Sequence, residues 1–190
     1  GRIISEMSKA GVSIDRIAYI LDEKEEDDRP GVTKPAINKD IVFDNVNFKY
    51  EEGAAVLKDV SFTVPAGKTF AILGNTGSGK STLVHLLNRL YDLPDGCGKI
   101  TIGGVDIRDI DRQYLRSQIG MVLQEPFLYS GSIKENVGIT KESSAFDDIR
   151  EACEIACVDS AIDSFTDGYE TIVGERGVTL SGGQKQRVAI

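Results

Sequence analysis

The sequence has few of the residues that form metal sites and disulfide frameworks. It contains three cysteines and one histidine, His85. An odd number of cysteines without a disulfide spacing suits a reducing compartment. Cys153 and Cys157 lie one helical turn apart, but the sequence has no second pair of ligands to complete a metal site with them. We therefore expect both cysteines to be small buried residues, and His85 to be structural.

Long apolar runs and an excess of basic charge are also missing. No apolar segment reaches the roughly 18 residues that a membrane-spanning helix requires. The 22 basic residues are outnumbered by 30 acidic ones, and no basic stripe with interleaved aromatic residues occurs, so nucleic acid is disfavoured as the main partner. An anionic ligand is not excluded, because charges about 4 Å apart still interact by about 4 kcal/mol at an effective dielectric near 20, whereas distant charges are screened.

What the sequence does contain is a glycine loop between a strand pattern and a helix pattern. Gly74-x-x-x-x-Gly79-Lys80-Ser81 follows the apolar run Phe70 to Leu73 and precedes apolar residues at helical spacing. Glycines let successive N–H groups approach phosphate oxygens, and the following helix adds roughly half a positive charge. Lys80 would reach the outer phosphates, and the Ser81 hydroxyl would ligate a magnesium ion. An ordinary glycine turn explains this context less well.

The segments around the loop predict an α/β chain with a helical beginning. Residues 1–40 have the pattern of short helices followed by a linker, because a charge run and Pro30-Gly31 end the helical spacing. Alternating segments at 41–50 and 56–64 predict two antiparallel strands. Further strands are expected at 70–73, 99–102 and 118–123, the last of them buried. We expect helices at 110–116, 133–137, 144–157 and 159–165, with Ser132 as an N-cap and Ser144 to Asp147 as a capping box.

A second glycine turn lies near the end of the sequence. Leu180-Ser181-Gly182-Gly183-Gln184 precedes the polar helix start Lys185 to Arg187. Paired glycines and a serine at a helix N-terminus offer bare N–H groups and a hydroxyl to an anion. Alone, such a turn is more often a loop than a site. About a hundred residues after a Walker A motif it is far more specific.

Together these motifs resemble the nucleotide-binding domain of an ATP-binding cassette (ABC) transporter. Gly74 to Thr82 matches the family's Walker A motif and Leu180 to Gln184 its signature motif, while Gln124 stands in the place of the Q-loop glutamine. Tyr50 matches the aromatic residue that stacks on adenine. The resemblance covers residues 41–190. It implies an α/β P-loop NTPase with a parallel core sheet, an N-terminal antiparallel β subdomain and a helical subdomain that carries the signature motif.

Two segments are similar to exporters whose membrane and ATPase domains share a polypeptide. They are Pro126 to Asn136 and Gly174 to Gly177. In such a protein, residues 1–40 would connect to the membrane domain, and residues 41–190 would be the nucleotide-binding domain on the cytoplasmic side of the membrane. Two alternatives remain: a soluble ABC protein without a membrane partner, and a regulatory module that closes on ATP without catalysis.

The resemblance also implies the site residues. ATP and Mg²⁺ would be held between two such domains in a head-to-tail dimer, with Lys80 and Gln124 as catalytic residues and with Ser81 and Gln124 at the magnesium ion. The residues expected to contact the nucleotide are Tyr50, Val56, Gly74, Asn75, Thr76, Gly77, Ser78, Gly79, Lys80, Ser81, Thr82, Gln124, Ser181, Gly182, Gly183 and Gln184.

One part of the family pattern is not found in the sequence. Beyond residues that correspond to Gln184 to Ile190, the family continues with the Walker B strand, its aspartate, a catalytic glutamate and a histidine switch. Hydrolysis needs a positioned base or water-orienting group, so we expect these 190 residues to contact nucleotide without turning it over. The Walker B strand belongs beside the strand of the glycine loop. We therefore also expect an unpaired sheet edge or an exposed apolar groove next to Phe70 to Leu73.

Overall fold

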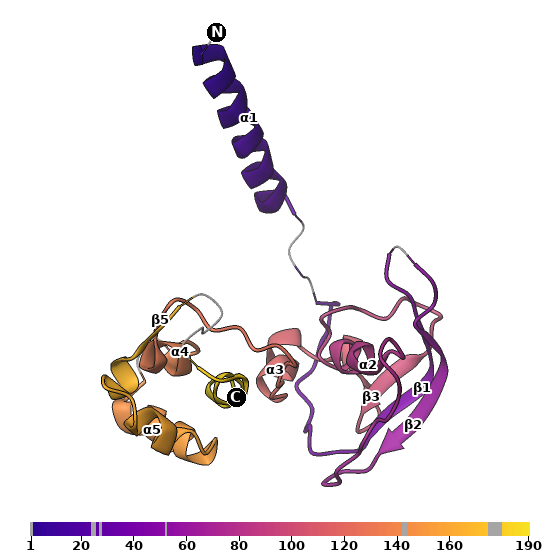
Figure 1. The fold of residues 1–190 in the computed structure, drawn as a ribbon. Coiled ribbons are helices and arrows are strands. Elements are labelled where there is room, and N and C mark those ends of the chain that lie inside the picture. Colours follow the sequence, from indigo (N-terminus) through magenta and orange to yellow (C-terminus); the bar gives the residue numbers. More distant parts are fainter. Residues whose placement is uncertain (1, 24–25, 27, 52, 142–143, 175–179) are drawn as a thin grey trace. The chain divides into compact units, whose positions relative to one another are not determined.

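The computed structural model describes residues 2–23, 26, 28–51, 53–141, 144–174 and 180–190 (Figure 1). These residues form two compact units, one up to Gln118 and the other from Ile119 onward. The first unit holds an antiparallel sheet and the glycine loop. The second is mostly helical and ends in the helix that follows Ser181. The α/β class, the antiparallel β subdomain and the helical subdomain with the signature motif are thus confirmed.

The first unit begins with a single long helix, α1 (Arg2–Leu21), where the sequence predicts short helices. Gly11 does not break it, because this glycine keeps a negative φ and continues the helical ladder. The apolar side chains of the last turns are exposed, Ile14 and Ile17 among them. No helix within the described ranges is both long and apolar enough to cross a bilayer.

The sheet of the first unit is built around strand β1 (Ile41–Phe48). It pairs antiparallel with β2 (Leu57–Val64) on one side and with β3 (Lys99–Ile102) on the other. β3 continues into β4 (Val105–Asp106), which gives the strand order β2-β1-β3-β4. The alternating sequence pattern predicts this arrangement, since alternation places every second side chain on the same face. Phe43, Val46 and Phe48 of β1 are buried.

Short helices complete the first unit. Helix α2 (Lys80–Leu87) follows the glycine loop, the 3₁₀ helix η1 (Ile107–Asp109) follows β4, and α3 (Arg112–Ser117) closes the unit. Aspartates cap two of them: Asp106 accepts from the backbone N–H of Arg108, and Asp111 from that of Tyr114. The helix predicted at 110–116 is therefore present, shifted by two residues at its start.

Two segments predicted as core strands have no strand pairing. They are 70–73 before the glycine loop and 118–123 after α3. Parallel strands are stable when neighbours hydrogen-bond to both edges and helices cover both faces. Among the described residues no strand pairs with either segment, so Leu73 is 93% exposed and Val122 56% exposed.

An exposed apolar groove lies next to the first of these segments, as expected. It runs between the inner faces of β1 and β2, the segment before the glycine loop, and helix α2. Its lining residues are Ile41, Phe43, Phe62, Val64, Phe70, Ile72, Leu83, Val84 and Leu87.

The second unit packs short helices around a two-stranded ribbon. Strands β5 (Gly131–Ser132) and β6 (Ile172–Val173) pair antiparallel. The helices are α4 (Ile133–Gly138), α5 (Phe146–Ile155), α6 (Asp159–Asp163), η2 (Gly168–Glu170) and α7 (Gly182–Val188). Their shared core contains Leu128, Ile133, Ile149, Cys153, Val158, Ile162, Tyr169, Val173, Leu180 and Val188.

Helix starts in this unit confirm one cap prediction and correct another. Ser132 caps α4 in a capping box with Glu135, as the sequence predicts. The capping box predicted at Ser144 to Asp147 does not form, because Ala145 occupies the N-cap and makes no side-chain bond. Asp147 and Asp148 in the first turn favour this helix start through its dipole instead.

The prediction that Cys153 and Cys157 are both buried is correct for Cys153 and wrong for Cys157. Cys153 is buried, and burial raises the pKa of its thiol. Cys157 is exposed, because the chain leaves the helix there with a φ of 54°.

Candidate nucleotide-binding site

The glycine loop is shaped by close backbone packing. Gly79 is the N-cap of α2 and has a φ of 86°, a left-handed conformation that favours glycine. A Cβ atom at this position would come within 2.7 Å of the Leu57 Cδ2 atom and 3.2 Å of the Val56 Cγ1 atom. A Cβ atom on Gly74 would meet the Ser78 Oγ atom at 2.6 Å. The positive φ and the close contacts together require glycine at position 79, whereas at position 74 the Ser78 hydroxyl would have to rotate away; Val56 packs directly against the loop at Gly79.

Lys80 folds back over this loop. Its Nζ atom donates to the carbonyl oxygens of Gly74 at 2.9 Å and Asn75 at 2.7 Å, and lies 3.4 Å from the Ser78 Oγ atom. These three partners are uncharged, so none of them is a counter-ion that would compete with an anionic ligand. Gly74 to Ser78 and Ser81 are exposed, and Gly79 is buried. The loop thus offers a positive charge, a hydroxyl and a cradle without side chains, which suits a polyphosphate.

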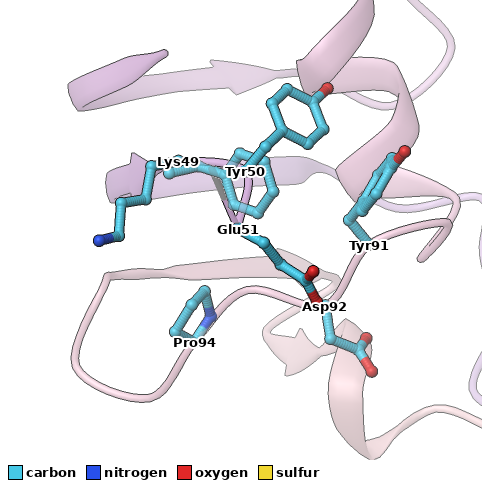
Figure 2. A pocket seen from close by; sticks show the side chains of 7 residues that line it. Lys49, Tyr50, Glu51, Tyr91, Asp92 and Pro94 are labelled. Carbon is cyan, nitrogen blue, oxygen red and sulfur yellow. The ribbon is translucent and has the colours of Figure 1, made fainter. Parts of the chain in front are cut away.

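Tyr50 lies at the edge of an aromatic pocket (Figure 2). Its hydroxyl is 3.0 Å from the Thr82 Oγ1 atom of α2, which ties the ring to the helix that begins at the glycine loop. Its ring makes T-shaped contacts with Phe48 and Tyr91 at centroid distances of 5.1 and 5.0 Å. The pocket has a volume of about 650 Å³ and is lined by Phe48, Lys49, Tyr50, Glu51, Tyr91, Asp92 and Pro94.

The far wall of this pocket was not predicted from the sequence. Tyr91, Asp92 and Pro94 belong to the segment after α2, whose sequence carries no nucleotide motif. The available signal in the sequence was an aromatic residue shortly after the helix that follows the glycine loop. Because this helix is short, both of its ends can lie within reach of one ligand.

The wall of the pocket is held by buried arginines. Arg89 is 2% exposed and pairs with Asp92 at 2.9 Å and with Asp28 at 3.1 Å. Arg112 also pairs with Asp92, at 2.8 Å. Burial would raise the pKa of Asp92, but the hydrogen bonds and charges of the two arginines outweigh it and hold that pKa below its usual value. Asp92 therefore stays ionised at the edge of the pocket.

The second predicted site lies in the second unit. Ser181 is the N-cap of α7: its Oγ atom accepts from the Gln184 N–H at 3.3 Å, and the Gln184 Oε1 atom accepts from the Ser181 N–H at 2.9 Å. Gly182 and Gly183 are exposed. The capping box leaves the Ser181 hydroxyl proton and the Gln184 amide N–H groups available as donors.

Gln124 lies beside this helix within the same unit. The Gln124 backbone carbonyl accepts from the Gln186 Nε2 atom at 3.3 Å, and Gln124 itself is exposed. A hollow next to it is lined by Gln124, Glu125, Pro126, Phe127, Gly182, Lys185 and Gln186. Of the exporter-like segments, Glu175 to Gly177 lie outside the described residues, and Pro126 to Asn136 begin at this hollow and continue into α4.

A family model described as "ABC transporter" matches residues 57–190. The chain belongs to the ABC transporter family. That match includes both the glycine loop and the Ser181 turn, the two motifs that carry the resemblance in the sequence.

ABC relatives extend the match to nearly the whole chain. The ATP-binding/permease protein YgaD of Bacillus subtilis (strain 168) is 46% identical over 97% of the chain, and a fatty acid ABC transporter ATP-binding/permease protein of Mycobacterium bovis is 43% identical over 94%. The chain covers only 32% and 28% of these two proteins. A solved structure of a bacterial Atm1-family ABC exporter with ATP bound superposes with a TM-score of 0.82 at 35% identity, over 96% of this chain and 32% of that one.

Proposed function

We propose that the chain is the ATP-binding part of an ABC exporter, and that it binds ATP with Mg²⁺ between the glycine loop and the Tyr50 pocket. The observation that carries the proposal is the joint construction of loop and pocket on helix α2. Gly79 begins this helix, Lys80 and Ser81 form its first turn, and Thr82 holds the Tyr50 hydroxyl. A phosphate loop and an aromatic surface on one short helix match the two ends of a nucleotide.

Each residue at this site has a proposed role. The N–H groups from Gly74 to Gly79 and the Lys80 ammonium would hold the phosphates, and the Ser81 hydroxyl would join the magnesium ion, which prefers few protein ligands and several phosphate or water oxygens. Asn75, Thr76 and Ser78 present backbone to the same anion. Val56 keeps the loop in place through Gly79, and Tyr50 would stack on the adenine.

The second half of the site would come from another copy of the domain. Exposed Gly182 and Gly183, with the free donors of Ser181 and Gln184, suit the outer phosphate of an ATP held by a partner in a head-to-tail dimer. Gln124 would contact the magnesium ion and the attacking water. Its backbone carbonyl is hydrogen-bonded to Gln186, so a shift of helix α7 would also move Gln124.

In the whole protein, ATP binding and hydrolysis would drive transport by a membrane domain on the same polypeptide. The relatives named above are ATP-binding/permease proteins, and their matches cover 97% and 94% of the chain, so they include most of residues 1–40 as well as the cassette. Helix α1 and the linker would then lead from the membrane domain to a cassette on its cytoplasmic side. We expect this chain to bind ATP without turning it over, and phosphate release measures that directly.

The test is nucleotide binding and phosphate release by the purified 190-residue chain with Mg²⁺ and ATP. Lys80→Ala should weaken ATP binding at least about tenfold, because a charge-assisted contact is lost. The matched control is Lys58→Ala, which removes an exposed lysine of β2 outside the site. Equal binding by wild type and Lys80→Ala would refute the nucleotide site. Phosphate release above that of Lys80→Ala would refute binding without turnover.

A further inference from the structure

We propose that Tyr91 is a specificity-determining residue of the nucleotide site: together with Tyr50 it forms an aromatic wall against which the nucleotide base packs. This rests on the proposed ATP-binding function and adds a residue that no motif in the sequence assigns. Figure 2 shows the rings of Tyr50 and Tyr91 next to each other, with Lys49, Glu51, Asp92 and Pro94 around the same opening.

The geometry of the two rings is specific. Their centroids are 5.0 Å apart and their planes meet at 83°, the edge-to-face arrangement that aromatic pairs prefer. Phe48 supports both, at 5.1 Å from Tyr50 and 6.1 Å from Tyr91. Tyr91 is nevertheless 46% exposed, whereas Phe48 is 5% exposed. Phe48 is thus the buried base of the cluster, and Tyr91 keeps an open surface toward the pocket.

The backbone under Tyr91 is fixed by its neighbours. Arg89 has a φ of 51°, which turns the chain sharply after α2, and its guanidinium donates to the backbone carbonyls of Ile107 and Ile110 at 3.4 and 3.1 Å. On the other side, Asp92 is held by Arg89 and Arg112. Tyr91 therefore lies between two anchored residues, and its ring also packs on Phe48, Tyr50 and His85.

Helix α2 connects Tyr91 to the glycine loop, where the phosphates are proposed to bind. The Tyr50 hydroxyl bonds to Thr82 in its first turn, and Tyr91 follows its last turn, where the Leu90 N–H still bonds to the His85 carbonyl. The two aromatic residues are thus fixed to opposite ends of the helix that begins at the glycine loop. A nucleotide bound by its phosphates would meet a preformed aromatic surface, which lowers the ordering cost of binding the base.

The experiment compares ATP with tripolyphosphate, which has the phosphates but no base, by calorimetric titration with Mg²⁺ on the full 190-residue chain. Tyr91→Ala should weaken ATP binding by about threefold to tenfold, the range of one aromatic contact, and leave tripolyphosphate binding unchanged. Tyr91→Phe should bind ATP like the wild type. The matched control is Tyr129→Ala, which also removes an exposed tyrosine from a T-shaped pair, here with Phe127 in the second unit.

Each outcome decides the proposal. Equal loss for both ligands in Tyr91→Ala would show a structural effect and overturn it, as would an unchanged ATP affinity. Tyr91→Leu repeats the test with more side-chain volume if the alanine variant melts early. A wild-type chain that binds ATP no tighter than tripolyphosphate would overturn the base pocket but keep the phosphate site, and one that binds neither would refute the proposed function as well.

Discussion

At the scale of single residues, Gly79 joins three parts of the site. Its left-handed φ starts helix α2, its missing side chain lets Val56 and Leu57 pack against the loop, and it directly precedes Lys80 and Ser81 of the proposed phosphate site. Gly96 offers a comparison that meets only one of these demands. Gly96 shares the positive φ, at 80°, but a Cβ atom there would meet nothing within 4 Å. Comparing substitutions at Gly79 and Gly96 therefore separates the cost of the left-handed backbone conformation from the cost of a steric clash.

Gly79→Ala should destabilise the chain more than Gly96→Ala. Both substitutions place a Cβ atom in the left-handed region, at about 1 kcal/mol each. Gly79→Ala also forces the Cβ atom against Leu57 and the Val56 carbonyl, which brings the expected loss to about 2–4 kcal/mol. Urea unfolding followed by circular dichroism measures both losses. Equal losses would mean that the loop shifts freely and that the clash has no role.

At the scale of elements, a cluster of arginines fastens the linker to the helices around the nucleotide pocket. Arg89, after α2, and Arg112, in α3, both pair with Asp28 of the linker and with Asp92 of the pocket. Arg116 pairs with Glu26 at 2.7 Å, and its hydrogen bond and charge lower the pKa of that carboxyl. The cluster therefore links residues far apart in sequence through charge-assisted bonds that a helix pattern cannot predict.

Arg89→Met should destabilise the first unit by about 2–4 kcal/mol. The substitution keeps the apolar stem but removes the guanidinium that bonds to Asp28, to Asp92 and to the backbone carbonyls of Ile107 and Ile110. The matched control is Arg150→Met in α5, whose pair with Glu154 is half exposed on both sides and should cost less than about 0.5 kcal/mol. Limited proteolysis near residue 28 gives a second readout, since a released linker should be cut faster. Similar losses for both variants would contradict a structural cluster at Arg89.

The elements also show which features could be predicted from the sequence and which could not. The strand pair β1–β2 and the cap at Ser132 depend on patterns within a few residues, and both are confirmed. The strands predicted at 70–73 and 118–123 depend on hydrogen bonds to other strands, which apolar composition cannot supply, and neither forms. Among site residues, the glycine loop and Tyr50 follow from motifs. Tyr91 depends on the turn at Arg89, whose positive φ gives no sequence signal.

At the scale of the whole molecule, the apolar groove beside Phe70 is an uncovered hydrophobic surface of the first unit. Phe70 stacks on Phe62 at a centroid distance of 5.1 Å, yet it is 46% exposed, and Ile72 is 38% exposed. Such a contiguous surface should bind the dye ANS strongly at neutral pH, although the chain remains folded. Ile72→Ser should reduce the ANS fluorescence and lower the unfolding free energy by about 1–2 kcal/mol, because Ile72 is only 38% exposed and part of its apolar surface is lost from the fold. The matched control is Ile155→Ser on α5, an apolar residue that is 77% exposed and lies outside the groove, which should leave the fluorescence unchanged. A similar drop in both variants would place the dye on scattered surface residues, whereas a drop for Ile72 alone would locate it at the face where β1, β2 and α2 meet.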